Sequence, residues 1–210
     1  MMKRNNFPFS AVLGLNHAKT AILIVLVNPR AGGLLISGPR GIGKSTLMRS
    51  TQELIERPWR DIPVSVTEDR LFGTIDTEKA IYSGQKKLYP GIINEADQGV
   101  LYLDDANLLR EDLLDFILNI AEVGAYQLER DGLSLRCDTS FTVIAAINPE
   151  SGMLSGACLD QFGLFVNVDN IHDENTRVEI LKRTISFEKD CASFCKLWKL
   201  ENEKIKKAIH

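Results

Sequence analysis

A glycine-rich stretch that ends in a lysine and two hydroxyl residues constrains this chain more than any other feature. Residues 38–46 read G-P-R-G-I-G-K-S-T and follow an apolar run, G-L-L-I-S, at residues 33–37. The pattern G-x-x-x-x-G-K-[ST] predicts a strand, a phosphate-binding loop and a helix, because the backbone N–H groups of such a loop and the dipole of the helix both favour a bound anion. We therefore expect the chain to bind a nucleoside triphosphate.

Each position of this loop has an expected role toward the triphosphate. The glycines let backbone N–H groups turn toward the phosphates, Lys44 would meet the β- and γ-phosphate oxygens, and the Ser45 hydroxyl would ligate Mg²⁺. The helix from Lys44 to about Glu56 adds its N-terminal dipole. The alternative is a glycine-rich turn with no ligand, but a chance match in a chain of this length is on the order of one per cent. The expected ATP-binding residues are Gly38, Pro39, Arg40, Gly41, Ile42, Gly43, Lys44, Ser45 and Thr46.

Composition argues against several other classes of protein. The formal net charge of −3 gives no overall reason to expect nucleic-acid binding. The longest apolar run, Ala21 to Val27, has seven residues, far fewer than the roughly 20 that span a bilayer, and we expect a buried helix there. No apolar segment typical of a secretory signal follows residues 1–4, so we expect a cytosolic protein, or one of the plastid stroma if a transit peptide was removed.

Short apolar runs that predict strands alternate with amphipathic segments that predict helices. This alternation is typical of an α/β domain with a five-stranded, doubly wound and mainly parallel sheet flanked by helices. Pro63 suggests that the second strand lies at a sheet edge or that the strand begins there. The expected strands are residues 33–37, 62–66, 99–103, 141–147 and 164–168, and the main expected helices are residues 11–27, 44–56, 111–123 and 176–187.

Polar side chains follow two of these strands. Asp104 and Asp105 come directly after the apolar run 99–103, which is typical of a Walker B element, and Asn148 follows the run 141–147. Ligands of open α/β sheets lie at the carboxyl ends of the strands. We therefore expect these side chains to lie near the phosphate loop.

Two segments are expected to stand outside the sheet. Residues 67–95 are long and polar, and long insertions of this kind usually carry function. Residues 126–136 alternate around Asp131-Gly132, the strongest short-range signal for a β-hairpin.

The C-terminal residues predict one more helix. Asp190 is a candidate helix cap, and the lysines that follow are expected to form a solvated helix face. Cys191 and Cys195 share a helix face and could hold a metal with His172 or His210, although packing of reduced thiols is much the commoner arrangement.

Several short motifs, in this order, resemble those of a known family. They are F-P-F-S at 7–10, the phosphate loop at 38–46, T-E-D-R at 67–70, G-T-I-D at 73–76, P-G at 90–91, the segment 101–109, E-R-D-G at 129–132, N-P-E at 148–150 and L-D-Q-F-G at 159–163. The order resembles the ATPase subunit of magnesium chelatase, an AAA+ protein, over about residues 7–188.

The resemblance implies a fold, a cofactor and partners. It implies an AAA+ module, residues 1–189, with a helix-2 insert at 67–95 and a hairpin before sensor 1 at 124–142, and residues 190–210 would begin a helical lid that is largely absent. Subunits or paralogues of this family form a ring, commonly a hexamer, with ATP and Mg²⁺ between neighbours. The ring works with an integrin-like subunit and a large porphyrin-binding subunit to insert Mg²⁺ into protoporphyrin IX, as a similar engine does in cobalt chelatases.

The resemblance also assigns roles in the site, and two positions depart from the family pattern. Asp105 stands where the family usually has glutamate, which retracts the carboxylate by about 1.5 Å, and small misplacements can cost orders of magnitude in rate. Gln161 stands where the family has an arginine that reaches the neighbouring subunit's ATP, and no Lys or Arg occurs at all in residues 149–163. The expected catalytic residues are Lys44, Asp105 and Asn148, the last as sensor 1, and the expected metal ligands are Ser45 and Asp104.

Three functions remain open from the sequence. The chain is expected to be the ATPase subunit of a magnesium or related metal chelatase, with weak intrinsic hydrolysis. Asp105 and Gln161 also favour a second hypothesis, a hydrolysis-impaired scaffold in a mixed AAA+ ring. An AAA+ remodeller of a different client would share the same core and differ in its partner.

Overall fold

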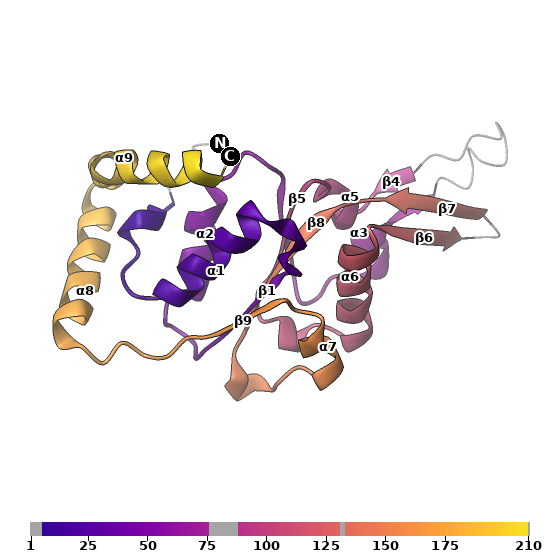
Figure 1. The fold of residues 1–210 in the computed structure, drawn as a ribbon, viewed down its shortest axis with the longest axis horizontal. Coiled ribbons are helices and arrows are strands. Elements are labelled where there is room, and N and C mark those ends of the chain that lie inside the picture. The colour runs from indigo at the N-terminus through magenta and orange to yellow at the C-terminus, as the bar shows by residue number, and fades with distance from the viewer. Residues whose placement is uncertain (1–5, 76–87, 131–132, 210) are drawn as a thin grey trace.

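A five-stranded parallel sheet forms the centre of the molecule (Figure 1). The computed structural model describes residues 6–75, 88–130 and 133–209. The strand order is β2-β5-β8-β1-β9, and every neighbouring pair runs parallel, which confirms the α/β expectation. The strands are β1 (Leu34–Ser37), β2 (Trp59–Ile62), β5 (Gly99–Leu103), β8 (Phe141–Ile147) and β9 (Leu164–Asn167).

The sheet separates two apolar clusters, because successive residues of a strand face opposite sides. In β1, Leu34 and Ile36 belong to one cluster and Leu35 to the other. The first cluster includes residues of α1, α2 and α9, and the second includes residues of α3, α5, α6 and α7; Figure 1 shows α1 and α2 on one side of the strands and α6 on the other. The helices are α1 (Asn16–Val27), α2 (Lys44–Gln52), α3 (Glu68–Phe72), α5 (Ile92–Glu95), α6 (Glu111–Val123), α7 (Gly156–Asp160), α8 (Glu174–Lys189) and α9 (Cys191–Ile209). The 3-10 turns are η1 (Phe9–Ala11), η2 (Pro29–Ala31), η3 (Ala106–Leu108) and η4 (Pro149–Ser151).

The second strand differs from the expected one. The expectation of a strand at residues 62–66 is wrong in its bounds, because β2 is Trp59–Ile62 and ends directly before Pro63, which has no N–H for the ladder. Trp59 anchors β2 through its ring, whose centroid lies 5.9 Å from that of Tyr102 in β5. The edge position that Pro63 suggested is confirmed, since among the described strands β2 pairs with β5 alone.

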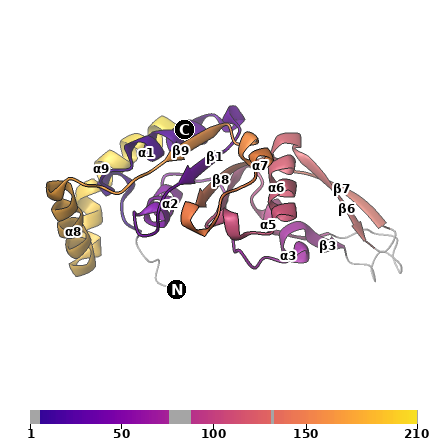
Figure 2. The same ribbon diagram turned by 90° about the horizontal axis from the view of Figure 1, so that it is seen from below.

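Two small antiparallel ribbons stand outside the sheet (Figure 2). The expected hairpin is confirmed: β6 (Ala125–Arg130) pairs with β7 (Leu133–Asp138), while the Asp131-Gly132 turn lies outside the described residues. Within the predicted insert, β3 (Gly73–Ile75) pairs with β4 (Leu88–Pro90), and residues 76–87 lie outside the described part. Both ribbons project from the end of the molecule opposite α8 and α9.

At the other end, α8 and α9 pack together through aromatic rings. Phe194 lies 5.2 Å from Phe7 and 5.7 Å from Phe187 between ring centroids. Asp190 caps α9 as expected, because the Ser193 N–H donates to its carboxylate at 3.0 Å. Within the described residues, which leave out His210, no group of three or more histidine, cysteine or acidic side chains is arranged to hold a metal. No helix in the described part of the chain is long and apolar enough to cross a membrane.

Candidate functional site

The predicted phosphate loop lies between β1 and α2 and has the backbone conformation that its glycines allow. Gly41 and Gly43 have φ angles of 81° and 96°, in the left-handed region that favours glycine. A Cβ at Gly41 would meet nothing within 4 Å, so backbone conformation rather than packing requires glycine there. The start of the loop is fixed differently, because a Cβ at Gly38 would lie 2.5 Å from the carbonyl oxygen of Val168.

Lys44 is held inside this loop. Its side chain is buried, and its Nζ donates hydrogen bonds to the carbonyl oxygens of Gly38 and Pro39. Burial lowers the pKa of Lys44, and the carboxylates of Asp105 and Asp104 oppose part of that shift. The ammonium group therefore occupies the loop's centre, with two acidic side chains close enough to interact with it.

The two predicted metal ligands are brought together. The Ser45 hydroxyl donates to the Asp104 carboxylate at 3.0 Å, across the space between α2 and the end of β5. Hydroxyl and carboxylate oxygens are ligands that Mg²⁺ accepts, and this ion usually keeps several of its waters.

Tyr102, the residue two before Asp104, supplies a test of whether this site fits a hydrated ion. Its hydroxyl oxygen is fully buried and forms no hydrogen bond of ordinary geometry with any described residue. Burial raises the pKa of Tyr102, as do the negative charge of Asp104 and a hydrogen-bonding interaction with it, while an interaction with Ser45 opposes part of that shift. A buried hydroxyl without a well-formed hydrogen bond is costly, and a metal-bound water beside Asp104 would satisfy it. The residues present therefore fit a hydrated Mg²⁺.

Asp105 lies in a left-handed backbone conformation, with φ 51° and ψ 48°, between β5 and η3. This conformation is uncommon for a residue other than glycine, although aspartate tolerates it better than most. The chain therefore turns sharply at Asp105, directly after β5, and this turn sets the direction of the Asp105 side chain. The carboxylate interacts with Lys44, which places it on the phosphate side of the site.

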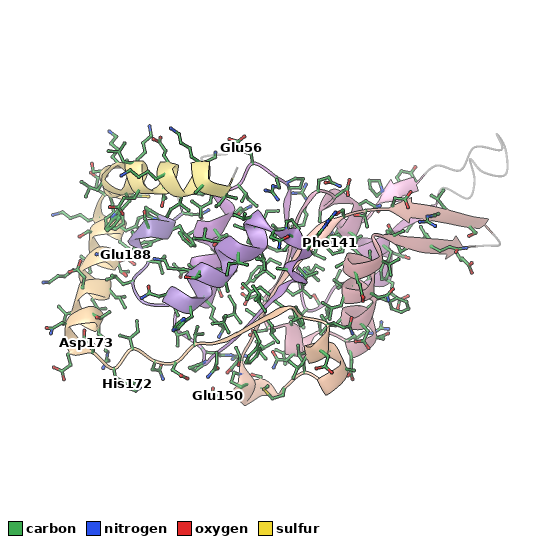
Figure 3. All side chains as sticks on the ribbon, in the orientation of Figure 1. Glu56, Phe141, Glu150, His172, Asp173 and Glu188 are labelled. Atoms are coloured by element: carbon green, nitrogen blue, oxygen red, sulfur yellow. The ribbon has the colours of Figure 1, made fainter. Side chains whose placement is uncertain are left out.

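Asn148 is buried at the end of β8, beside the Asp105 turn. Its side-chain oxygen accepts from the Glu150 N–H at 3.3 Å, and its backbone oxygen accepts from Asn107 Nδ2 at 3.1 Å. Figure 3 labels Glu150 at this edge of the molecule. Asn107 also donates to the Gly152 oxygen at 2.9 Å and so joins the two turns. Sequence reasoning missed Asn107, for which the only signal was its place two residues after Asp105.

A cavity of about 810 Å³ adjoins the phosphate loop. It is lined by the N-terminal segment around Val12, by the loop residues 41–43 and by α8. Figure 3 shows His172 before α8 and Glu188 near its far end; both line the cavity, which therefore runs along most of that helix. Its apolar lining beside a phosphate loop is suited to a base or other flat ring.

Gln161 lies away from these groups. It follows α7, is exposed, and its Nε2 donates only weakly, to the Ala157 oxygen at 3.4 Å. The next residues lead to the amino end of β9, where the Gly163 N–H donates to the Gly32 oxygen, immediately before β1. The phosphate loop follows the opposite, carboxyl end of β1. The structure thus brings Lys44, Ser45, Asp104, Asp105 and Asn148 together and leaves Gln161 at the other end of the strands.

Comparisons with known proteins agree with this geometry. The family model of the AAA domain, dynein-related subfamily, matches residues 33–161. The magnesium-chelatase 38 kDa subunit of Cereibacter sphaeroides is 35% identical over 236 residues, covering 97% of this chain and 71% of the relative. The magnesium-chelatase subunit ChlI homolog of Methanocaldococcus jannaschii is 32% identical, covering 100% of this chain and 67% of the relative.

A solved structure gives the same result. In a complex between the BchI and BchD subunits of magnesium chelatase, one chain superposes with a TM-score of 0.74 and 35% identity, over 98% of this chain and 74% of that one. The expected resemblance is confirmed, and this chain belongs to the AAA proteins and, among them, to the family of magnesium-chelatase ChlI or 38 kDa subunits.

Proposed function

We propose that the chain is the ATP-binding motor subunit of a magnesium or related metal chelatase. It would bind MgATP between neighbouring subunits of a ring and couple ATP binding and hydrolysis to insertion of the metal into a tetrapyrrole. The observation that carries this proposal is the convergence of Lys44, the Ser45–Asp104 pair and Asn148 on one end of a parallel sheet. We place this activity in the cytosol or in a plastid, since one relative is a chloroplastic ChlI subunit from Glycine max.

The residues of the site divide the work of phosphoryl transfer, which needs mainly positioning and charge neutralisation. Lys44 would exchange its bonds to the Gly38 and Pro39 carbonyls for bonds to the β- and γ-phosphates. Asp105 would accept a proton from the attacking water, and Asn148 would orient that water. Held by Ser45 and Asp104, Mg²⁺ would neutralise phosphate charge.

The proposed partners are further subunits of a ring, an integrin-like subunit and a large porphyrin-binding subunit. What supports assembly with a partner subunit is the likeness to a chain in a complex between the BchI and BchD subunits of magnesium chelatase. Co-purification of the chain with such subunits, followed by fluorescence of the metallated porphyrin, tests the chelatase part directly. Assembly with the partners without metal insertion would refute it.

A second function, a nucleotide-binding scaffold that does not hydrolyse ATP, is favoured by the short Asp105 side chain and by the uncharged Gln161. Purified chain should bind MgATP with micromolar-scale affinity under either proposal, and Lys44→Ala should abolish that binding. Turnover that is lost in Lys44→Ala removes the scaffold proposal. Binding without turnover, in rings of confirmed size, removes the motor proposal.

A further inference from the structure

The turn that carries Arg30 packs directly on the turn that follows Gln161. Arg30 lies in η2, between α1 and β1. The Gly163 N–H donates to the Gly32 oxygen at 2.8 Å, and a Cβ at Gly163 would lie 1.7 Å from the Ala31 oxygen. Since no side chain separates the two backbones, Arg30 and Gln161 stand on adjoining turns.

Arg30 is held on a rigid turn and has a free side chain. Pro29 opens η2, and the Ala31 N–H donates to the Asn28 oxygen at 3.0 Å. The Arg30 side chain is exposed and forms no hydrogen bond or ion pair with any residue that the structure describes. A guanidinium in this setting keeps all its N–H donors available.

The position of Arg30 excludes its own ATP site as a target. Arg30 precedes β1 and the phosphate loop follows it, so the length of the strand separates the two. Four residues of β1, at roughly 3.3 Å each, span about 13 Å. The charge of Arg30 is therefore available to a second molecule.

Exposed apolar side chains near Arg30 favour contact with another subunit. Ile24 and Val27, near the end of α1, are 45% and 58% exposed, and Phe165 on β9 is 54% exposed. β9 is the edge strand on this side and contacts α1, while Phe165 pairs with Leu35 and so faces the side of the sheet opposite α1. The exposed side chains of α1 and Phe165 therefore flank this edge of the sheet on its two faces. Exposed apolar groups beside an open sheet edge favour burial against another chain.

We propose that Arg30 reaches the γ-phosphate of ATP bound to the adjacent subunit and supplies the positive charge that Gln161 lacks. This inference rests on the proposed ring with ATP between subunits. The guanidinium would donate two N–H bonds to γ-phosphate oxygens and stay protonated throughout. Water forms the new bond to the γ-phosphorus while the bond to the β,γ-bridging oxygen breaks. The electron pair leaves with ADP, the water proton passes through Asp105 to solvent, and the products are ADP and phosphate.

The first test measures ATP turnover in rings whose assembly is confirmed by size. Arg30→Ala should lower the rate by at least tenfold, since an arginine in this role is typically worth about 10³ to 10⁵. Arg57→Ala, which removes a half-exposed arginine between α2 and β2 near the other sheet edge, should leave the rate unchanged. Adding Gln161→Arg to Arg30→Ala should restore turnover. An unchanged rate in Arg30→Ala overturns the proposal.

A second test asks whether Arg30 acts between subunits. Lys44→Ala subunits cannot use their own ATP but still present Arg30, whereas Arg30→Ala subunits keep an intact site. In a random equimolar mixture, half of the subunits keep the site and half of those meet a donor of Arg30, so about one quarter of the wild-type rate should return. A mixture no faster than its two components, with mixed rings confirmed, refutes action between subunits.

A third test does not depend on hydrolysis. If Arg30 binds the neighbour's γ-phosphate, the wild-type chain should assemble at a lower concentration with a slowly hydrolysed ATP analogue than with ADP. In Arg30→Ala, the ratio between these two assembly concentrations should be at least tenfold smaller. Sedimentation at a series of concentrations measures this. Wild-type rings that assemble with the analogue but never hydrolyse ATP would overturn the motor proposal. The comparison with Arg30→Ala would still show whether Arg30 contacts the neighbour's γ-phosphate. Equal analogue dependence in both proteins would overturn the role of Arg30 alone.

Discussion

Replacing Tyr102 by phenylalanine should stabilise the nucleotide-free chain. The Tyr102 hydroxyl oxygen is buried and forms no hydrogen bond of ordinary geometry with any described residue, although Asp104 and Ser45 lie close enough to interact with it. A buried hydroxyl that is left unsatisfied costs about 1–3 kcal/mol. Its removal leaves the ring and its contact with Trp59 in place. We expect the free energy of unfolding to rise by about 1 kcal/mol, which corresponds to roughly 2–4 °C in Tm for a chain of this size.

The same substitution should weaken the part of ATP binding that depends on Mg²⁺. If a metal-bound water is the partner of the Tyr102 hydroxyl, Tyr102→Phe loses one hydrogen bond, worth about 0.5–1.5 kcal/mol, or roughly two- to tenfold in affinity. Binding measured without Mg²⁺ should not change. Titration of a fluorescent ATP analogue, with Mg²⁺ and with a chelator, separates the two quantities.

Tyr126→Phe is the matched control. The Tyr126 hydroxyl lies 2.8 Å from the Phe72 oxygen and 2.7 Å from Asn94 Oδ1, so it is partly buried with partners. Removing it should lower Tm and leave Mg²⁺ dependence untouched. The reasoning about Tyr102 is refuted if Tyr102→Phe lowers Tm as Tyr126→Phe does, and if its ATP affinity responds to Mg²⁺ as the wild type does.

Three further predictions follow from single positions. Asp105→Glu extends the carboxylate by about 1.5 Å and should raise kcat in assembled rings by at least tenfold; a steady-state ATPase assay that finds no rise would show that carboxylate reach does not limit turnover. Gly163→Ala places a Cβ against the Ala31 oxygen and should cost more than about 2 kcal/mol in a urea titration, whereas Gly156→Ala, where a Cβ meets nothing within 4 Å, should cost almost nothing; equal effects would contradict the tight approach of the two turns. Burial, with a contribution from Cys191, raises the pKa of Cys195 to about 11, so its alkylation at pH 8 should be roughly a hundredfold slower than that of free cysteine and should accelerate up to pH 11; ordinary reactivity at pH 8, located by mass spectrometry, would count against this.

The fold was largely predictable because its strongest signals are local. The phosphate loop, the apolar runs of β5 and β8 and the Asp131-Gly132 pair each depend on a few adjacent residues. The bounds of β2 were not predictable in this way, because Trp59 belongs to the strand through its packing on Tyr102, forty-three positions away in the chain.

The site shows the same division. Lys44, Ser45 and Asp104 were assigned from motifs, and the structure brings them together. Asn107 and Arg30 were missed, because what distinguishes them is spatial: Asn107 joins the turns after β5 and β8, and Arg30 adjoins a segment more than 120 residues later. No periodicity or spacing in the sequence reports contacts of this kind.

The opposition between the two ends of β1 has a consequence for assembly. One end carries the phosphate loop and the other carries the turns of Gly32 and Gly163, so the surfaces that would meet between neighbours are different surfaces. Such contacts are heterologous and directional: they close into a ring when the rotation between subunits divides a full turn, and otherwise continue as an open helix. A chain altered at one end alone would still accept a neighbour at the other, and it would act as a terminator that limits how far the assembly grows.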